Sequence, residues 1–205
     1  MDNGRELLLD GLAELGIVAT DRQVDLLLAF VKLMTKWNKA YNLSAIREQE
    51  AMLRLHILDS LAVLPYVSGQ KIIDVGTGAG LPGVPLAIFM PDVQFTLLDS
   101  NSKKTRFVQQ SIMELNLSNI EIIHGRVEGL GRAAEFDVVI SRAFASLYDI
   151  MALTEYLLQP QGALLAMKGG VPKEELAQIG REYSVKSIVV PGVEAERCLV
   201  RINKT

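Results

Sequence analysis

Apolar residues in the first seventy positions recur at the spacing of an α-helix. After Thr20 they stand three or four positions apart, at Val24, Leu27, Leu28, Val31 and Met34. Thr20 and Gln23 form the pattern of a capping box, which predicts that this helix begins near Asp21. Two more helices are expected, one over residues 5–15 that stops at Gly16 and one over residues 48–64 that is ended by Pro65. The sequence thus predicts an N-terminal helical extension over residues 1–67.

The pattern changes after Ser68 and Gly69 to short runs rich in Ile and Val that alternate with helical segments, as in βαβ units. A helix is expected over residues 172–179, and strands at residues 71–74, 93–98, 120–123, 136–140, 163–167, 185–190 and 198–202. The last two strands are too close for a parallel crossover, which favours an antiparallel hairpin. We predict one Rossmann-like α/β domain over residues 68–205, with a mostly parallel seven-stranded sheet and an antiparallel last strand.

A glycine-rich segment follows the first expected strand and opens into a helix that has Pro85 in its first turn. The strand ends near Asp74, and Gly76, Gly78 and Gly80 alternate after it. An ordinary tight turn is the alternative, but three alternating glycines weaken the ends of the strand and the helix around them. Glycine lets the backbone turn sharply and approach a ligand closely, so we interpret this segment as a ligand-binding loop.

The loop must be weighed against a dinucleotide-binding motif, because Gly78, Gly80 and Gly83 match G-x-G-x-x-G. In that motif the first glycine follows the strand at once, whereas here Asp74 and Gly76 intervene. An acid at the strand end would repel a pyrophosphate and would suit the ammonium and sulfonium charges of S-adenosylmethionine. The context therefore favours a methyltransferase.

Asp99 and Ser100 close the second expected strand, where a carboxylate can accept hydrogen bonds from ribose hydroxyls of either cofactor. The chain after the sheet is too short for a separate substrate domain, and no His–acid pair is evident as a hydride-transfer site. A nicotinamide-dependent reductase is therefore the weaker alternative.

Composition narrows the class of protein further. Hydrophobic residues make up 49% and charged residues 22%, and no apolar run approaches the roughly 18 residues that cross a bilayer. We expect no secretory signal, no membrane association and a cytoplasmic location. Cys198 is the only cysteine and lies in the last expected strand, so we expect it to be buried, and no disulfide or structural metal is expected.

Without a cysteine nucleophile or a Pro-Pro-aromatic loop, methylation of a pyrimidine carbon or an exocyclic amine is not indicated. An acceptor that already has a lone pair, such as N7 of guanine, is the option that remains. Such an acceptor needs positioning more than a general base.

Basic residues gather in two places although the formal net charge is −3. One group contains Lys32, Lys36, Lys39 and Arg47, and the other contains Lys103, Lys104 and Arg106. Solvated helix faces are the simpler interpretation, and nucleic-acid contact is the functional one.

Several long motifs stand in fixed order over nearly the whole chain. They are WNKAYNLSAI at 37–46, HILDSL at 56–61, the glycine loop, LDS at 98–100, RVE at 126–128 and ISRAFA at 140–145. In these motifs the chain resembles the bacterial small-subunit ribosomal RNA guanine-N7 methyltransferases, once called glucose-inhibited division protein B. The resemblance implies methylation of one guanine in the decoding-region hairpin of 16S rRNA, in the assembled or assembling 30S subunit.

The resemblance also implies cofactor contacts, at Gly76, Leu81, Val127, Glu128 and Arg142. Arg142 is expected to help orient cofactor and RNA, with no certain catalytic residue. The loop argument adds Asp74, Gly78, Asp99 and Ser100 to the cofactor site. RNA contacts are expected at Lys39, Asn42, Arg47, His56, Lys103, Lys104 and Arg126.

Three alternatives stay open. Trp37 continues an apolar helix face, so core packing is preferred over base stacking. His56 can contact RNA or cofactor, or can cap its helix. The whole chain can be a non-catalytic ribosome assembly factor that keeps the cofactor fold. A monomer is expected.

Overall fold

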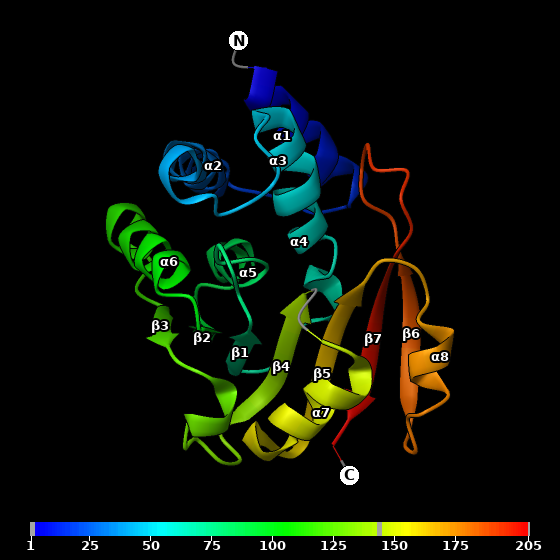
Figure 1. The fold of residues 1–205 in the computed structure, drawn as a ribbon. Helices are drawn as coiled ribbons and strands as arrows, with labels where there is room; N and C mark the ends of the chain where they lie inside the picture. Colours follow the sequence, from blue (N-terminus) through cyan, green and yellow to red (C-terminus); the bar gives the residue numbers. More distant parts are fainter. Residues whose placement is uncertain (1–2, 143–144, 205) are drawn as a thin grey trace.

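The computed structural model describes residues 3–142 and 145–204, which form one seven-stranded sheet with helices on both faces (Figure 1). The strand order is β3-β2-β1-β4-β5-β7-β6. The strands are β1 (Lys71–Val75), β2 (Gln94–Asp99), β3 (Ile120–His124), β4 (Phe136–Arg142), β5 (Leu158–Lys168), β6 (Tyr183–Ile188) and β7 (Arg197–Asn203). Neighbouring strands from β3 to β5 are parallel, and β7 lies antiparallel between β5 and β6. The predicted fold class is confirmed.

Side chains that alternate along the strands feed two hydrophobic cores. Ile72, Leu97 and Ile140 point to one face, and Ile73, Val75 and Val139 point to the other. The first face is covered by the helices that precede β3, and the second by the short helices that follow β4. These helices are α1 (Asn3–Glu14), α2 (Asp21–Tyr41), α5 (Gly83–Phe89) and α6 (Ser102–Leu115) on the first face, and α7 (Leu147–Thr154) and α8 (Lys173–Leu176) on the second.

The N-terminal helices share one core with the sheet. Thr20 caps α2 as predicted, because its side chain accepts from the Gln23 amide while the Gln23 side chain accepts from the Thr20 amide. Along α2 the buried side chains include Leu27 and Phe30, and the Phe30 ring stacks on Phe107 of α6 with centroids 5.9 Å apart. The division at residue 67 stays a prediction.

The third helix differs from the continuous helix predicted over residues 48–64. It consists of α3 (Gln49–Met52), a π-helical segment η1 (Leu53–Leu58) and α4 (Asp59–Leu61), and Pro65 lies in a separate 3₁₀ turn, η2 (Leu64–Tyr66). Apolar spacing does not reveal a π-helical turn, which widens the helix and is frequent at functional sites. Here the wide turn carries His56 and is followed at once by Asp59.

Smaller differences concern the second half of the chain. β5 begins at Leu158, five residues before the predicted start, with a register irregularity between Phe136 and Val138 of its neighbour. The helix predicted over residues 172–179 is only the four-residue α8. These differences leave the carboxyl ends of β1, β4 and β5 in place beneath the N-terminal helices.

Candidate active site

The buried carboxylate of Asp74 holds the glycine loop through two hydrogen bonds. Oδ2 of Asp74 accepts hydrogen bonds from Thr77 Oγ1 at 2.7 Å and from the Gly83 amide at 2.8 Å. Gly76 and Gly80 have φ values of 73° and 82°, a region that side chains rarely adopt. Burial raises the pKa of Asp74 to about 6, against the opposing effect of the bonds from Thr77 and Gly83.

Asp74 was predicted as a direct cofactor contact, and its position gives it another role. The side chain is fully buried and lines neither of the two pockets beside the loop. Its Oδ1 has no hydrogen-bond partner among the described residues. In this geometry Asp74 fixes the shape of the loop rather than facing a ligand.

One pocket, the β2–β3 pocket, lies at the carboxyl ends of β2 and β3 and has a volume of about 400 Å³. It collects many of the predicted cofactor residues, namely Gly76, Asp99, Ser100, Val127 and Glu128, together with Lys104 and Arg126. The Asp99 carboxylate accepts from the Gly78 amide at 2.8 Å and from the Asn101 amide at 2.8 Å, which orients it at the end of its strand. Arg126, predicted to contact RNA, lines the same pocket as these predicted cofactor residues.

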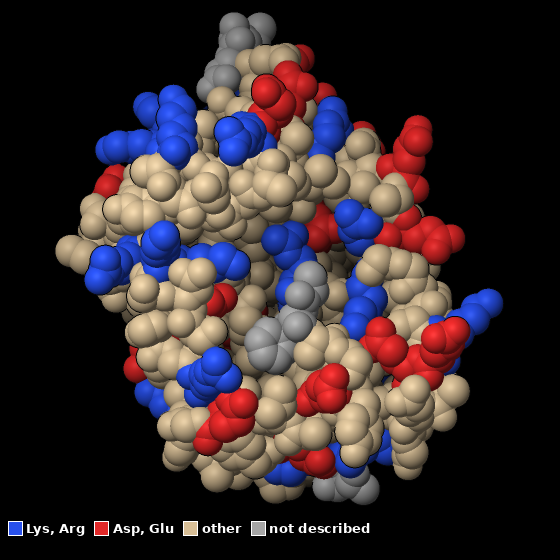
Figure 2. Space-filling model, in the orientation of Figure 1, with Lys and Arg blue, Asp and Glu red and all other residues tan. Residues whose placement is uncertain are grey.

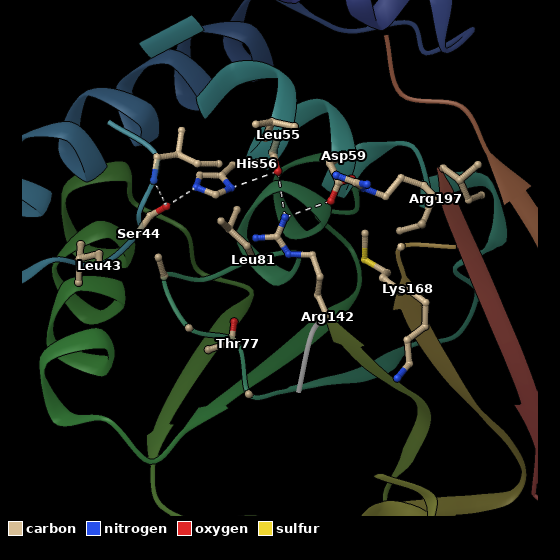
Figure 3. Close-up of a pocket in the computed structure, with 18 of the residues that line it drawn as sticks. Leu43, Ser44, Leu55, His56, Asp59, Thr77, Leu81, Arg142, Lys168 and Arg197 are labelled. Atoms are coloured by element: carbon tan, nitrogen blue, oxygen red, sulfur yellow. Dashed lines mark hydrogen bonds and ion pairs between the residues drawn. The ribbon is translucent and has the colours of Figure 1, made fainter. Parts of the chain in front are cut away.

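The second pocket, the β4 pocket, adjoins the first and has a volume of about 490 Å³. Its walls come from the N-terminal helices, the glycine loop and the ends of β4, β5 and β7 (Figure 3). Of the predicted residues it contains Gly76, Gly78, Leu81, His56, Lys104 and Arg142. Gly76 and Lys104 line both pockets, so the glycine loop is the boundary between them.

A buried carboxylate joins two arginines at the edge of the β4 pocket. Asp59 is 4% exposed, and its Oδ2 accepts from Arg142 Nη1 at 3.1 Å while its Oδ1 accepts from Arg197 Nε at 2.8 Å. Arg142 Nη1 also donates to the Leu55 carbonyl at 3.1 Å. The Arg142 guanidinium therefore lies across the pocket between Leu81 and Asp59 (Figure 3).

His56 lies in the same wall and is held as a neutral imidazole. Its Nε2 is 2.8 Å from Ser44 Oγ, and its Nδ1 is 3.1 Å from the Leu55 carbonyl. Because a carbonyl can only accept, Nδ1 carries the proton, and Nε2 accepts from the Ser44 hydroxyl. Burial, followed by the positive charge of Arg142, lowers the pKa of His56 to about 4. The helix-cap alternative is wrong, since His56 lies inside the π-helical segment.

Other predicted RNA residues lie outside both pockets, on the surface. Lys39, Arg47 and Lys103 are exposed and form no ion pair with any described carboxylate. Asn42 ends α2 in the left-handed conformation, with φ 49°. Trp37 is half-buried and packs on the core and on Phe107, as preferred from the sequence.

The lysines of the first basic group lie on α2, which packs beside α6 with the second group, and Arg47 lies in the segment between α2 and α3. Lysine and arginine side chains gather over these helices and around the central hollow in Figure 2. Ala143 and Phe144 of the ISRAFA motif lie outside the described residues.

Sequence reasoning missed several polar residues of the β4 pocket, chiefly Ser44, Asp59, Lys168 and Arg197. His56 and Asp59 stand three apart, a spacing that places both on one helix face, and this signal could have been used. No such sequence signal was present for Arg197, because its partner Asp59 is 138 positions away.

Among the described residues, no helix is long and apolar enough to cross a membrane, and no three His, Cys, Asp or Glu side chains are grouped as a metal site. Cys198 is buried in β7, as predicted.

Solved structures of similar shape define the class of the fold. A SAM-dependent methyltransferase from Aquifex aeolicus has a TM-score of 0.57 and 14% identity, over 83% of this chain and 98% of that one. TYW2 of M. jannaschii in complex with AdoMet has a TM-score of 0.55 and 16% identity, over 72% of this chain and 74% of that one. The chain has the fold of S-adenosylmethionine-dependent methyltransferases.

Sequence comparison identifies the family. The family model described as rRNA small subunit methyltransferase G, GidB, matches residues 23–199. Ribosomal RNA small subunit methyltransferase G of Legionella pneumophila is 53% identical over 98% of this chain and 95% of its own length. The proteins of that name from Laribacter hongkongensis and Escherichia coli are 48% identical over 98% of each chain, and 49% identical over 93% of this chain and 94% of the relative. The chain belongs to the rRNA small subunit methyltransferase G family.

The pKa of His56 generates a prediction on stability. Because this pKa falls from the usual 6.5 to about 4 in the folded state, the unfolded chain binds the proton first as the pH falls. His56 therefore costs the folded state free energy that grows between about pH 6.5 and pH 4, to on the order of 2–3 kcal/mol. We expect the His56→Gln variant to lose less stability than the wild type over this range, measured by urea unfolding.

The comparison must use the difference between variants, because the raised pKa of Asp74 changes stability in the opposite direction over the same range. His124→Gln, at an exposed histidine, is the matched control and should behave as the wild type. Parallel pH profiles for wild type and His56→Gln would contradict the assignment of a buried neutral His56.

Proposed function

We propose that the protein transfers the methyl group of S-adenosylmethionine to N7 of a guanine in the decoding-region hairpin of 16S rRNA, within the 30S subunit. The observation that carries this proposal is the pair of adjoining pockets that share Gly76. A bisubstrate reaction needs two sites that meet at the transferred group. The family name and the fold support the choice of methyl donor and of ribosomal RNA as acceptor.

The residues of the β2–β3 pocket fit the nucleoside part of the cofactor. Asp99 would accept hydrogen bonds from the ribose hydroxyls at the end of β2, and buried Val127 offers an apolar surface to the base. Glycine at positions 76 and 78 leaves room for the close approach of the cofactor to the backbone. Gly76, Leu81 and Arg142 would face the methionine end, where the loop meets the β4 pocket.

When bound, the cofactor supplies an activated methyl group on a positive sulfur. Guanine N7 has a lone pair at neutral pH, so the N–CH₃ bond forms as the S–CH₃ bond breaks, and positive charge passes from sulfur to the base. No proton leaves N7, so no general base is required. The chain's residues act by holding nitrogen and carbon in line at a near-attack separation of roughly 3 to 3.5 Å.

The basic residues of α2 and α6 would bind the RNA backbone around this site. Lys32, Lys36, Lys39, Lys103 and Arg106 are exposed and have no described carboxylate as a partner. Such unpaired cations bind phosphate regardless of base sequence. A ribosomal substrate implies a cytoplasmic protein, and we propose that it acts as a monomer.

The proposal is tested on 30S subunits that lack N7-methylguanine. After incubation with protein and S-adenosylmethionine, borohydride and aniline cleavage of the 16S rRNA should reveal one new site, in the decoding-region hairpin. Cofactor binding without any methyl transfer would favour the non-catalytic assembly factor instead. Transfer to another atom or another RNA would also contradict the proposal.

Gly76→Asp should abolish cofactor binding and leave the protein folded. With φ at 73°, a side chain is strained there, and the added carboxylate would stand at the boundary of the two pockets. We expect the affinity for S-adenosylmethionine, measured by calorimetry, to fall by roughly a hundredfold or more. Gly180→Asp, where the new side chain meets open space, is the matched control. Unchanged affinity in a folded Gly76→Asp protein would refute this role of the loop.

Replacing Lys103 and Lys104 together with alanine should weaken binding to 30S subunits. Both residues belong to the first turn of α6, where cations are unfavourable by roughly 0.3 to 1 kcal/mol, which favours a compensating use in binding. The slope of log affinity against log salt should fall by about 2. Lys173→Ala with Lys186→Ala, in α8 and β6 near the opposite edge of the sheet (Figure 1), should leave the slope unchanged. An unaltered slope in the Lys103→Ala, Lys104→Ala variant would show that these lysines are solvated surface residues that do not bind RNA.

A further inference from the structure

The β4 pocket contains a pair of arginines whose geometry is fixed by one carboxylate. We propose that Arg197, held by buried Asp59, donates a hydrogen bond to O6 of the acceptor base and thereby selects guanine over adenine. This inference rests on the function proposed above. It assigns a specificity-determining role to Arg197 and a positioning role to Asp59.

Asp59 is the only carboxylate among the described residues that line this pocket, and both of its oxygens already accept from arginine. Its side chain is 5% exposed, whereas the side chains of Arg142 and Arg197 are 21% and 26% exposed. The carboxylate is thus enclosed, and the guanidinium groups reach the open part of the pocket. An incoming base meets donors on this wall.

Arg197 has a donor to spare. Its Nε binds Asp59 and its Nη1 binds the Glu196 carbonyl at 2.9 Å, while Nη2 has no partner among the described residues. Arg142 approaches Asp59 from the side of the glycine loop, and Arg197 approaches from β7 on the other side (Figure 3). With Arg142 beside the loop that receives the cofactor, Arg197 is the arginine on the acceptor side.

Guanine and adenine differ at the purine edge beside N7, so a donor at this position can distinguish the two bases. Beside N7, guanine carries the acceptor O6, whereas adenine carries the donor N6 amino group. A guanidinium placed beside N7 donates a hydrogen bond to O6 of guanine and leaves the N6 amino group of adenine without an acceptor. An enzyme that methylates N7 without reading O6 could not separate the two bases at this edge.

The neighbouring lysines do not supply the same donor. Lys168 Nζ is already bonded to the Ala145 carbonyl and to both carboxylate oxygens of Glu175. Lys104 lies at the boundary with the β2–β3 pocket. Arg197 therefore offers the most available donor on the wall opposite the loop.

The test uses 30S subunits reconstituted with 16S rRNA that carries either guanine or 2-aminopurine at the methylated position. 2-Aminopurine keeps N7 and lacks O6. The single-turnover methylation rate is measured on both substrates with saturating cofactor. We expect the wild type to prefer guanine, and Arg197→Met, which keeps the apolar stem, to lose about tenfold to a hundredfold of that preference.

Dividing the preference of each variant by that of the wild type cancels any intrinsic difference in N7 reactivity between the two bases. Arg201→Met, on the same strand and outside the pocket, should retain the wild-type preference. Asp59→Asn should reduce the preference because it removes the charge that holds Arg197, and it should also lower cofactor affinity because Asp59 holds Arg142. If Arg197→Met does not fold, Arg197→Lys carries the same comparison and should keep part of the preference.

Three results would overturn the inference. Equal slowing on both substrates would make Arg197 a structural residue. A loss of subunit affinity with a salt slope lower by about 1, at unchanged preference, would make it a phosphate contact. No methylation of guanine by the wild type would overturn the proposed function itself, and this result is seen before any variant is made.

Discussion

The double ion pair of Asp59 ties together three parts of the chain that are far apart in sequence. Through Arg142 and Arg197 it connects the N-terminal helices to β4 and to β7. Burying these charges costs desolvation free energy, so such a cluster adds little net stability over a well-packed apolar alternative. Removing one partner, however, leaves an uncompensated buried charge, so the cluster holds a particular arrangement. That arrangement is the far wall of the β4 pocket.

The N-terminal helices therefore form part of the β4 pocket and are not only an exposed basic surface. Residues between Leu43 and Asp59 form one wall of the β4 pocket, while the sheet supplies the glycine loop and the strand ends. The π-helical turn brings His56 and Asp59 to this wall, and the Leu55 carbonyl serves Arg142 and His56 together. Cofactor and acceptor would then meet at Gly76, with the sheet on one side and the helices on the other.

The sequence predicted those features that local patterns determine. The capping box of α2, the glycine loop and the antiparallel last strand were all predictable, because each depends on residues close together in the chain. It did not predict the π-helical turn, since apolar spacing is nearly the same in α- and π-helices over one turn. Nor could it predict that Arg197 meets Asp59, since this pairing depends on the packing of the complete sheet. Asp74 was placed at the correct strand end, but its burial beneath the loop could not be predicted, because it depends on the three-dimensional packing of the chain.

The central claim is that the cofactor and the acceptor guanine occupy adjoining pockets that meet at the glycine loop. The most direct measurement is an electron cryo-microscopy structure of the protein on the 30S subunit with S-adenosylhomocysteine bound. The account predicts the adenosine part beside Asp99 in the β2–β3 pocket, and a flipped guanine in the β4 pocket with N7 facing the cofactor sulfur. An adenosine part in the β4 pocket, or a guanine that reaches the sulfur from any other direction, would contradict it.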